Sequence, residues 1–171
     1  MNDLIELIKS RRSIRHFLNK PVEDEIIYKV LDAGRWAPSG LNNQPWKFVI
    51  IKNQDLKQKI GELSHYKRIF IEAPVLIGIF LDTNSIYHRE KDIMGIGACF
   101  ENILLAIHAL GLGGVWLGEI LKAKKEVSEI LNLEEHLELM GFIAFGYPDK
   151  EKIKNLKSQR KDLKELIIKE A

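Results

Sequence analysis

Val75-Leu76-Ile77-Gly78-Ile79-Phe80-Leu81 is the stretch that decides the fold. It is a continuous apolar run after Pro74, and such a run is typical of a strand that is covered on both faces. The strongest helical pattern of the chain follows it, because apolar residues recur between Asp92 and Leu110 at spacings of three, four and seven. Together they predict a buried strand followed by a long core-facing helix.

Weaker patterns extend from this centre in both directions. They predict strands at 46–51, 114–117 and 139–146, and helices at about 4–8, after Pro21, and at 55–64, 122–131 and 162–168. The alternation of helices and strands indicates an α/β or α+β domain with two or three layers. The sequence contains no internal repeat, low-complexity segment or linker, so we interpret residues 1–171 as a single domain.

Small residues interrupt the long predicted helix. Gly95, Gly97 and Ala98 would let another backbone approach it closely. Two interpretations carry equal weight at this point: a second subunit covers the helix, or the helix is central to the monomer's own core.

Composition excludes several classes of protein. The net charge of +2 is too small for a general nucleic-acid binder, and no segment reaches the roughly 20 uninterrupted apolar residues of a membrane span. The lone Cys99 excludes an internal disulfide framework and multi-cysteine metal sites, and its apolar surroundings favour a small buried residue. Because the N-terminus carries acids inside its apolar run, it resembles neither a signal nor a transit peptide. We therefore expect a cytoplasmic protein.

Basic residues gather in two places, at 9–20 and at 150–161, and the two clusters could converge on one anion. The first contains Arg11-Arg12-Ser13-Ile14-Arg15, whose guanidinium groups and hydroxyl are suited to a phosphate. A simpler interpretation is a solvated helix end, where cations are favourable by about 0.3–1 kcal/mol. The polar loop 37–46, which reads Ala-Pro-Ser-Gly-Leu-Asn-Asn-Gln-Pro-Trp, adds amide and hydroxyl groups suited to a polar ring. The two motifs together suggest a phosphorylated cofactor.

Several catalytic motifs are missing. The glycine-rich run from Gly111 fails the dinucleotide fingerprint because its sixth position is Trp116, and no segment matches a phosphate-binding loop ending in Lys-Ser/Thr. The histidines do not fall at metal-ligand spacings, and no serine lies in a Gly-x-Ser-x-Gly elbow, so we predict no metal and no catalytic side chain. Chemistry would then belong to a cofactor that the protein positions.

Four motifs, in this order, resemble the nitroreductase family of flavin enzymes along essentially the whole chain. They are residues 11–15, residues 37–46, Gly111-Leu112-Gly113-Gly114-Val115-Trp116-Leu117-Gly118-Glu119, and Gly146-Tyr147-Pro148 with the later Lys157 and Arg160. The resemblance implies an α+β fold, an α/β/α three-layer sandwich with a mainly antiparallel central sheet flanked by helices. It also implies a homodimer that holds two FMN molecules in clefts at the subunit interface.

The resemblance also implies cofactor-binding residues. Phosphate and first ring contacts fall on Arg11, Arg12, Ser13 and Arg15, with C-terminal phosphate contacts on Lys157 and Arg160. The loop that reaches the flavin held mainly by the partner subunit contains Pro38, Ser39, Gly40 and Asn42. The segment beside the isoalloxazine ring contains Trp116, Leu117, Gly118 and Glu119.

The implied activity is hydride transfer from NAD(P)H through FMN to a nitroaromatic, quinone or similar acceptor by a ping-pong mechanism. Two alternatives stay open: a flavin-binding or storage module with little turnover, and a specialised enzyme of the same fold, such as a dehalogenase or a flavin-fragmenting enzyme. The chain departs from the family in two ways. It is short, with only Asp82 to Lys91 as a partial lid, and Gly40 stands where a second small polar residue is common.

Overall fold

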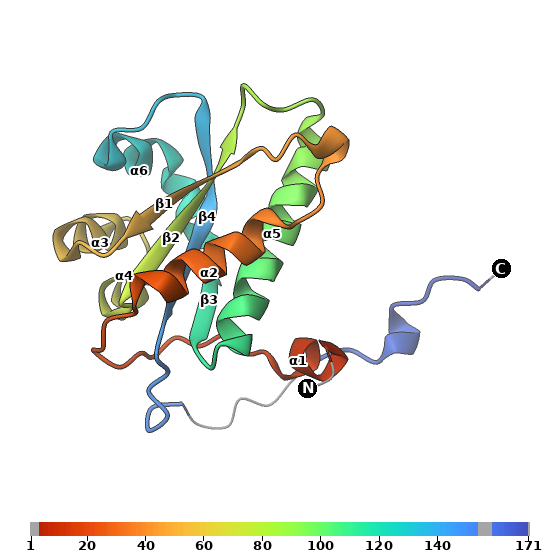
Figure 1. The fold of residues 1–171 in the computed structure, drawn as a ribbon, viewed down its shortest axis with the longest axis horizontal. Coiled ribbons are helices and arrows are strands. Elements are labelled where there is room, and N and C mark those ends of the chain that lie inside the picture. The colour runs from red at the N-terminus through yellow and green to blue at the C-terminus, as the bar shows by residue number, and fades with distance from the viewer. Residues whose placement is uncertain (1–3, 154–158, 171) are drawn as a thin grey trace.

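The computed structural model describes residues 4–153 and 159–170. A four-stranded sheet forms its centre, in the order β1-β2-β4-β3, and every neighbouring pair is antiparallel (Figure 1). The strands are β1 (Trp46–Ile51), β2 (Val75–Asp82), β3 (Gly113–Leu117) and β4 (Leu137–Gly146). Every residue of β2 is buried, which confirms the prediction of a strand covered on both faces.

One face of the sheet carries α2 (Asp24–Arg35) and α5 (Arg89–Ala109). Alternate residues of β2, among them Ile77 and Ile79, point into this layer and share a core with both helices. Cys99, which was predicted to be buried, is part of that core, and burial raises the pKa of its thiol to about 12. Cys99 is therefore a packing residue, as its apolar surroundings predicted.

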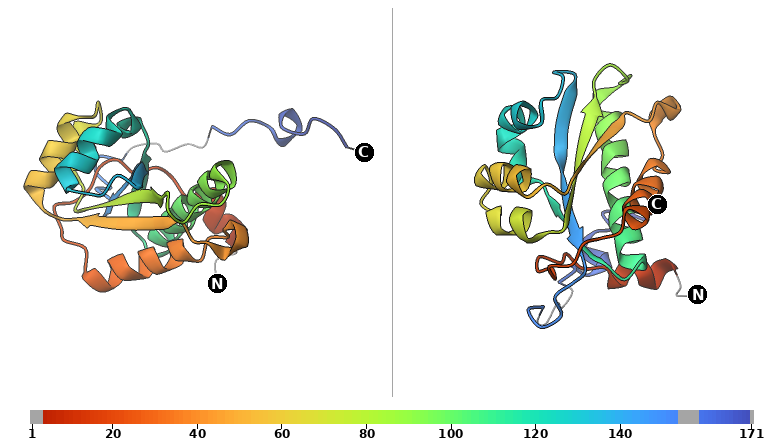
Figure 2. Two further views of the ribbon diagram at one scale, coloured as in Figure 1. Left: turned by 90° about the horizontal axis from the view of Figure 1, so that it is seen from above. Right: turned by 60° about the vertical axis from the view of Figure 1, so that its left-hand side comes forward.

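The opposite face carries α3 (Gln54–Glu62), α4 (Lys67–Glu72) and α6 (Lys124–Leu131). Leu76 and Phe80, the intervening residues of β2, pack into this second core with Ile60, Phe70 and Val127. Figure 2 shows the sheet from above, lying between the two helical layers. The three-layer α+β sandwich is thus confirmed.

Local signals explain one end of each of two helices, α3 and α6. The Asn53 side chain accepts a hydrogen bond from the Leu56 amide at 2.9 Å and so begins α3. Asn132 ends α6 with a left-handed backbone, at φ 50°. The structure adds α4, which the sequence did not predict, and starts α6 two residues later than predicted, after a 3₁₀ turn at Glu119–Ala123.

Helix α5 is 21 residues long and, by length and composition alone, apolar enough to cross a membrane. In this fold it is the core helix of one layer, because residues such as Ile96, Phe100 and Ile103 are buried against the sheet and α2.

The two terminal segments lie outside the sandwich. Helix α1 (Leu4–Ser10) contacts the C-terminal half of α5 but buries none of its residues. The tail from 159 to 170 runs away from the domain (Figure 1), and only Leu163–Glu165 forms a short 3₁₀ turn. The helix predicted at 162–168 is therefore wrong, since this tail has no core to pack against.

Candidate cofactor site

The basic motif at 11–15 forms an extra edge beside β3. Ser13 pairs with Gly114 in a parallel bridge, and the Ile14 amide donates to the Gly114 carbonyl at 3.0 Å. The segment therefore follows a rigid strand rather than fraying from α1. Its side chains start from a fixed backbone, which is a requirement for a preorganised binding site.

A cavity of about 250 Å³ opens beside this edge. Its lining combines hydroxyl and cationic groups from three separate parts of the chain: Ser13, Ile14, Arg15, His16, Arg68, Lys152 and Ile153. The Arg68 guanidinium donates to the Arg15 carbonyl at 3.3 Å and to the Glu72 carboxylate at 2.6 Å. Lys152 lies 3.1 Å from the Asp149 carboxylate, whereas Arg15 has no ion-pair partner within the described part of the chain. The cavity has the charge and the donors that an anion needs.

The first two arginines of the motif lie beside α5. The Arg11 side chain is 16% exposed, and its Nε lies 3.6 Å from a Glu101 oxygen but makes no hydrogen bond with any described residue. Arg12 donates to the carbonyls of Lys9 and Arg11 at 2.6 and 2.8 Å. Burial, with Arg11 and Arg12 nearby, lowers the pKa of His108, and Ser10 Oγ lies 2.8 Å from its Nε2. Two arginines therefore lie near the imidazole at this end of α5.

The segment after β3 presents an aromatic plane and a carboxylate. Trp116 is 44% exposed and stacks on Phe100, with ring centroids 4.0 Å apart and an angle of 8° between the planes. Leu117 is buried in the second core, so it could contact a ligand only through its backbone. Glu119 accepts from Ser64 Oγ at 2.7 Å, and its ion pair with Lys122 is the main cause that lowers its pKa.

The loop at residues 38–44, called here the 38–44 loop, lies at the other end of α5. The space above Gly95 is closed by the Pro38 carbonyl and by Ser39. Leu41, Asn42 and Gln44 all have positive φ, a conformation that is rare for residues other than glycine. The Ser39 hydroxyl holds this turn by accepting from the Gln44 amide at 3.0 Å.

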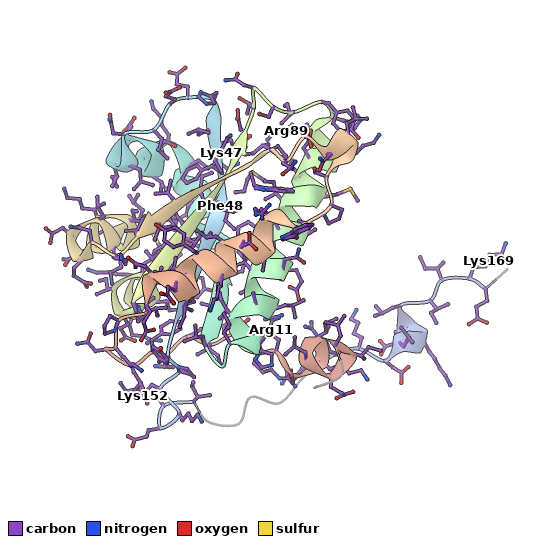
Figure 3. The ribbon with its side chains drawn as sticks, in the orientation of Figure 1. Arg11, Lys47, Phe48, Arg89, Lys152 and Lys169 are labelled. Carbon is purple, nitrogen blue, oxygen red and sulfur yellow. The ribbon has the colours of Figure 1, made fainter. Side chains whose placement is uncertain are left out.

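The two halves of the predicted site are therefore separate within one protomer. Ser39 lies beside Gly95 and Ser10 beside His108, a spacing along α5 of about 20 Å at 1.5 Å per residue. Figure 3 makes the separation visible, with Arg89 and Arg11 at opposite ends of that helix. The motifs at 11–15 and 116–119 share the β3 edge, and the 38–44 loop does not join them.

The C-terminal phosphate contacts remain predictions. Lys157 lies outside the described residues, and Arg160 is exposed in the tail. Sequence reasoning missed Arg68 and Lys152, which line the cavity instead. Arg68 belongs to no sequence motif, whereas Lys152 belongs to the basic cluster at 150–161 that was predicted to converge with residues 9–20. Lys152 does line one cavity with residues 13–16, and convergence on an anion stays a prediction.

Comparisons with known proteins identify the family to which this fold belongs. A three-layer α+β domain with a basic segment along the edge of its sheet is suited to holding a phosphorylated cofactor. The family model described as "Nitroreductase family" matches residues 8–67 and 64–147. The chain belongs to the nitroreductase family.

Three relatives illustrate the range of that family. A Desulfovibrio desulfuricans protein, provisionally named a nitroreductase and crystallised in complex with FMN, has 38% identity and a TM-score of 0.93, covering 100% of this chain and 98% of its own. A Methanothermobacter thermautotrophicus protein, provisionally named an NADH dehydrogenase/NAD(P)H nitroreductase, is 35% identical over 85% of this chain and 78% of its own length. An iodotyrosine deiodinase from Thermotoga neapolitana is 31% identical over 90% and 93%.

Proposed function

We propose that this protein is an FMN-dependent oxidoreductase that uses NAD(P)H to reduce nitroaromatic, quinone or similar acceptors. The observation that carries the proposal is the cationic cavity beside the 11–15 edge, in a chain whose relative with 38% identity is crystallised with FMN. When bound, FMN supplies the hydride chemistry that no side chain here offers. The protein's part is to bind, orient and shield.

The residues at the β3 edge fit a phosphorylated cofactor. Ser13, Arg15 and Lys152 would hold the phosphate, and each charge-assisted hydrogen bond contributes about 1.5–3 kcal/mol. The buried Nε of Arg11 has an unused donor that a ligand would satisfy. The flat Trp116 ring and the Gly118 backbone lie farther along the same edge, where a planar ring would follow the phosphate.

We further propose that two copies complete the site. Within one protomer the 38–44 loop and the 11–15 edge lie at opposite ends of α5, so a second copy would bring its loop to this edge. Gly97 supports a close approach, because a Cβ placed there meets nothing within 4 Å in the protomer. Exposed apolar side chains that would be covered include Leu4, Ile5, Leu41, Met94, Leu166 and Ile168.

A second candidate function has its own support. The iodotyrosine deiodinase relative, which matches 90% of this chain, favours reductive dehalogenation of an aromatic ring over flavin storage. Both candidates use the same cofactor edge and differ only in the acceptor. We place the protein in the cytoplasm, in keeping with its lone, buried Cys99.

The first experiment identifies the cofactor and the turnover. Heat-released flavin from the purified protein should chromatograph as FMN, and NADH or NADPH should be consumed when a nitroaromatic is added. Recovery of FAD, or a colourless protein that cannot be reconstituted with FMN, would contradict the proposal that FMN is the cofactor. Bound FMN without turnover would support the storage module, and turnover only with an iodinated phenol would support the dehalogenase.

The second experiment tests whether donor and acceptor share one site. If a single ring face is open, NAD(P)H must leave before the acceptor binds. Initial rates over a matrix of donor and acceptor concentrations should then give parallel double-reciprocal lines. Intersecting lines would require a ternary complex and contradict the shared site.

The third experiment tests the dimer through Gly97. Gly97→Leu should leave the protomer folded, because the position has open space and leucine favours a helix by several tenths of a kcal/mol over glycine. It should nevertheless weaken the dimer and its FMN content, as measured by sedimentation and absorbance. A wild-type protein that sediments as a flavin-loaded monomer near 19.7 kDa would overturn the proposal.

A further inference from the structure

A buried carboxylate joins the 38–44 loop to the 83–88 segment, which connects β2 with α5. Asp92 is fully buried, and its two oxygens accept from Asn43 Nδ2 at 2.7 Å and from the amides of Tyr87 and His88 at 3.0 Å each. The same Asn43 nitrogen donates to the Ser85 carbonyl at 3.0 Å. The loop and the segment are therefore held as one unit at the N-terminal end of α5, where Figures 1 and 2 show them next to each other.

This unit presents one aromatic ring. The Tyr87 backbone is fixed by Asp92, while its side chain remains 43% exposed. The ring lies directly over Gly40, and a Cβ at that position would overlap it. Lys91 Nζ lies 5.5 Å from the ring centroid. Gly40 thus makes room for a ring that is held in place and still open on one side, unlike a core side chain.

We propose that Tyr87 is a specificity-determining residue that stacks planar aromatic acceptors at the mouth of the flavin site. This inference rests on the proposed function, in which the 38–44 loop reaches the flavin held mainly by the second copy. Tyr87 would lie beside that flavin together with the 38–44 loop, because its ring lies over Gly40. An electron-poor nitroaromatic ring gains from offset stacking on a phenol, whereas a compact inorganic acceptor has no ring to stack.

The test compares two acceptors with the FMN-loaded holoenzyme. For Tyr87→Ala, we expect kcat/KM with p-nitrobenzoate to fall about three- to tenfold, mainly through KM, which is the range that a ring–ring contact corresponds to. The value with ferricyanide should not change. Tyr87→Phe keeps the ring and should retain nitrobenzoate activity. The control is Tyr28→Ala, which removes an exposed tyrosine from α2 and should alter neither acceptor.

A second variant tests the contact itself. Gly40→Ser introduces a Cβ where the Tyr87 ring lies, so it should displace the ring and lower the ratio of kcat/KM for p-nitrobenzoate to that for ferricyanide, whatever it does to FMN content. Adding Gly40→Ser to Tyr87→Ala should cause no further loss of selectivity. If kcat/KM falls equally with both acceptors, so that the ratio of the two values does not change, this inference is overturned while the proposed function stays intact. A wild-type holoenzyme that fails to oxidise NAD(P)H with either acceptor would overturn the proposed function, and this inference with it.

Discussion

The two ends of helix α5 are built in opposite ways. At the N-terminal end, the buried carboxylate of Asp92 accepts three hydrogen bonds, and although burial acts to raise its pKa, those bonds hold the pKa below its ordinary value. At the C-terminal end, Arg11 and Arg12 lie near His108, and a Glu101 carboxylate oxygen lies 3.6 Å from Arg11. One end has a buried carboxylate satisfied within the protomer, and the other gathers cations around an imidazole.

This difference indicates that the paired Asp92 carboxylate is part of the scaffold, whereas the cations at the C-terminal end offer a binding surface. A carboxylate that is satisfied by its own chain fixes two segments relative to each other and gains nothing from a ligand. Clustered cations repel one another, so an added anion would stabilise them. We therefore expect loss of the Asp92 carboxylate to act on folding, and substitutions at the C-terminal end to act on cofactor affinity.

The largest effect should come from Asp92→Ala. It leaves the Asn43 amide and the backbone amides of Tyr87 and His88 without their acceptor in a buried place. Unsatisfied buried donors cost about 1–3 kcal/mol each, so we expect unfolding by urea to show a loss of about 3 kcal/mol or more. Asp55→Ala, at an exposed position in α3, is the control and should change stability by less than about 1 kcal/mol. Equal losses in both variants would remove the distinction between the two ends.

Asp92 also shows why part of the molecule could not be predicted from the sequence. Acids in the first turn of a helix usually complement the helix dipole at the surface, and Glu90 is exposed in this way. Nothing local distinguishes Asp92, whose burial depends on two segments that meet only in the folded chain. Its partner Asn43 lies 49 positions earlier in the sequence.

The central strands could be predicted because their signal is local. An apolar run such as β2 reports burial on both faces without knowledge of its neighbours. Helix α4 was missed since its six residues are too few to establish a helical period, and Arg68 was missed with it. The cavity lining was predictable for the segment at 11–15 and, through the basic cluster at 150–161, for Lys152. Arg68 could not be predicted because it reaches the cavity through tertiary packing. The roles of the predicted cofactor residues stay predictions.

The next effect is expected at the basic end and in the tail. Arg12→Ala and Arg160→Ala should each weaken FMN binding by about 1–3 kcal/mol if each removes one charged hydrogen bond. Titration of the apoprotein with FMN, followed by flavin fluorescence, measures the loss. Unfolding by urea without FMN should change little for Arg160, which is exposed. Unchanged affinity in both variants would show that the phosphate lies elsewhere.

The control for these variants has to be chosen from the structure. Arg89 belongs to none of the four sequence motifs, but it lies at the same end of α5 as the 38–44 loop and donates to both Glu138 oxygens at 2.7 and 2.9 Å. Arg89, helped by Lys124, lowers the Glu138 pKa to about 2, so removing Arg89 disturbs a structural ion pair. Lys125→Ala is the better control, because the Lys125 side chain is 87% exposed. Its ion pair with Glu129 is loose, at 3.9 Å between the nitrogen and the nearest carboxylate oxygen. A loss of FMN affinity in Lys125→Ala would indicate a general effect of charge.

The smallest effect should be a pH dependence from His108. Burial, Arg11 and Arg12 lower the pKa of this imidazole, so the folded protein binds the proton less readily than the unfolded chain does. The stabilising contribution is therefore complete above about pH 6.5, the ordinary value for histidine, and is lost as the pH falls through the lower folded pKa. His108→Gln, which can still hydrogen-bond Ser10, should flatten that part of the stability profile measured by urea unfolding between pH 5 and 7.5. FMN should also flatten it in the wild type, because a phosphate near Arg11 and Arg12 offsets their repulsion of the imidazolium. If FMN leaves the difference between wild type and His108→Gln unchanged, the phosphate does not lie at this end of α5.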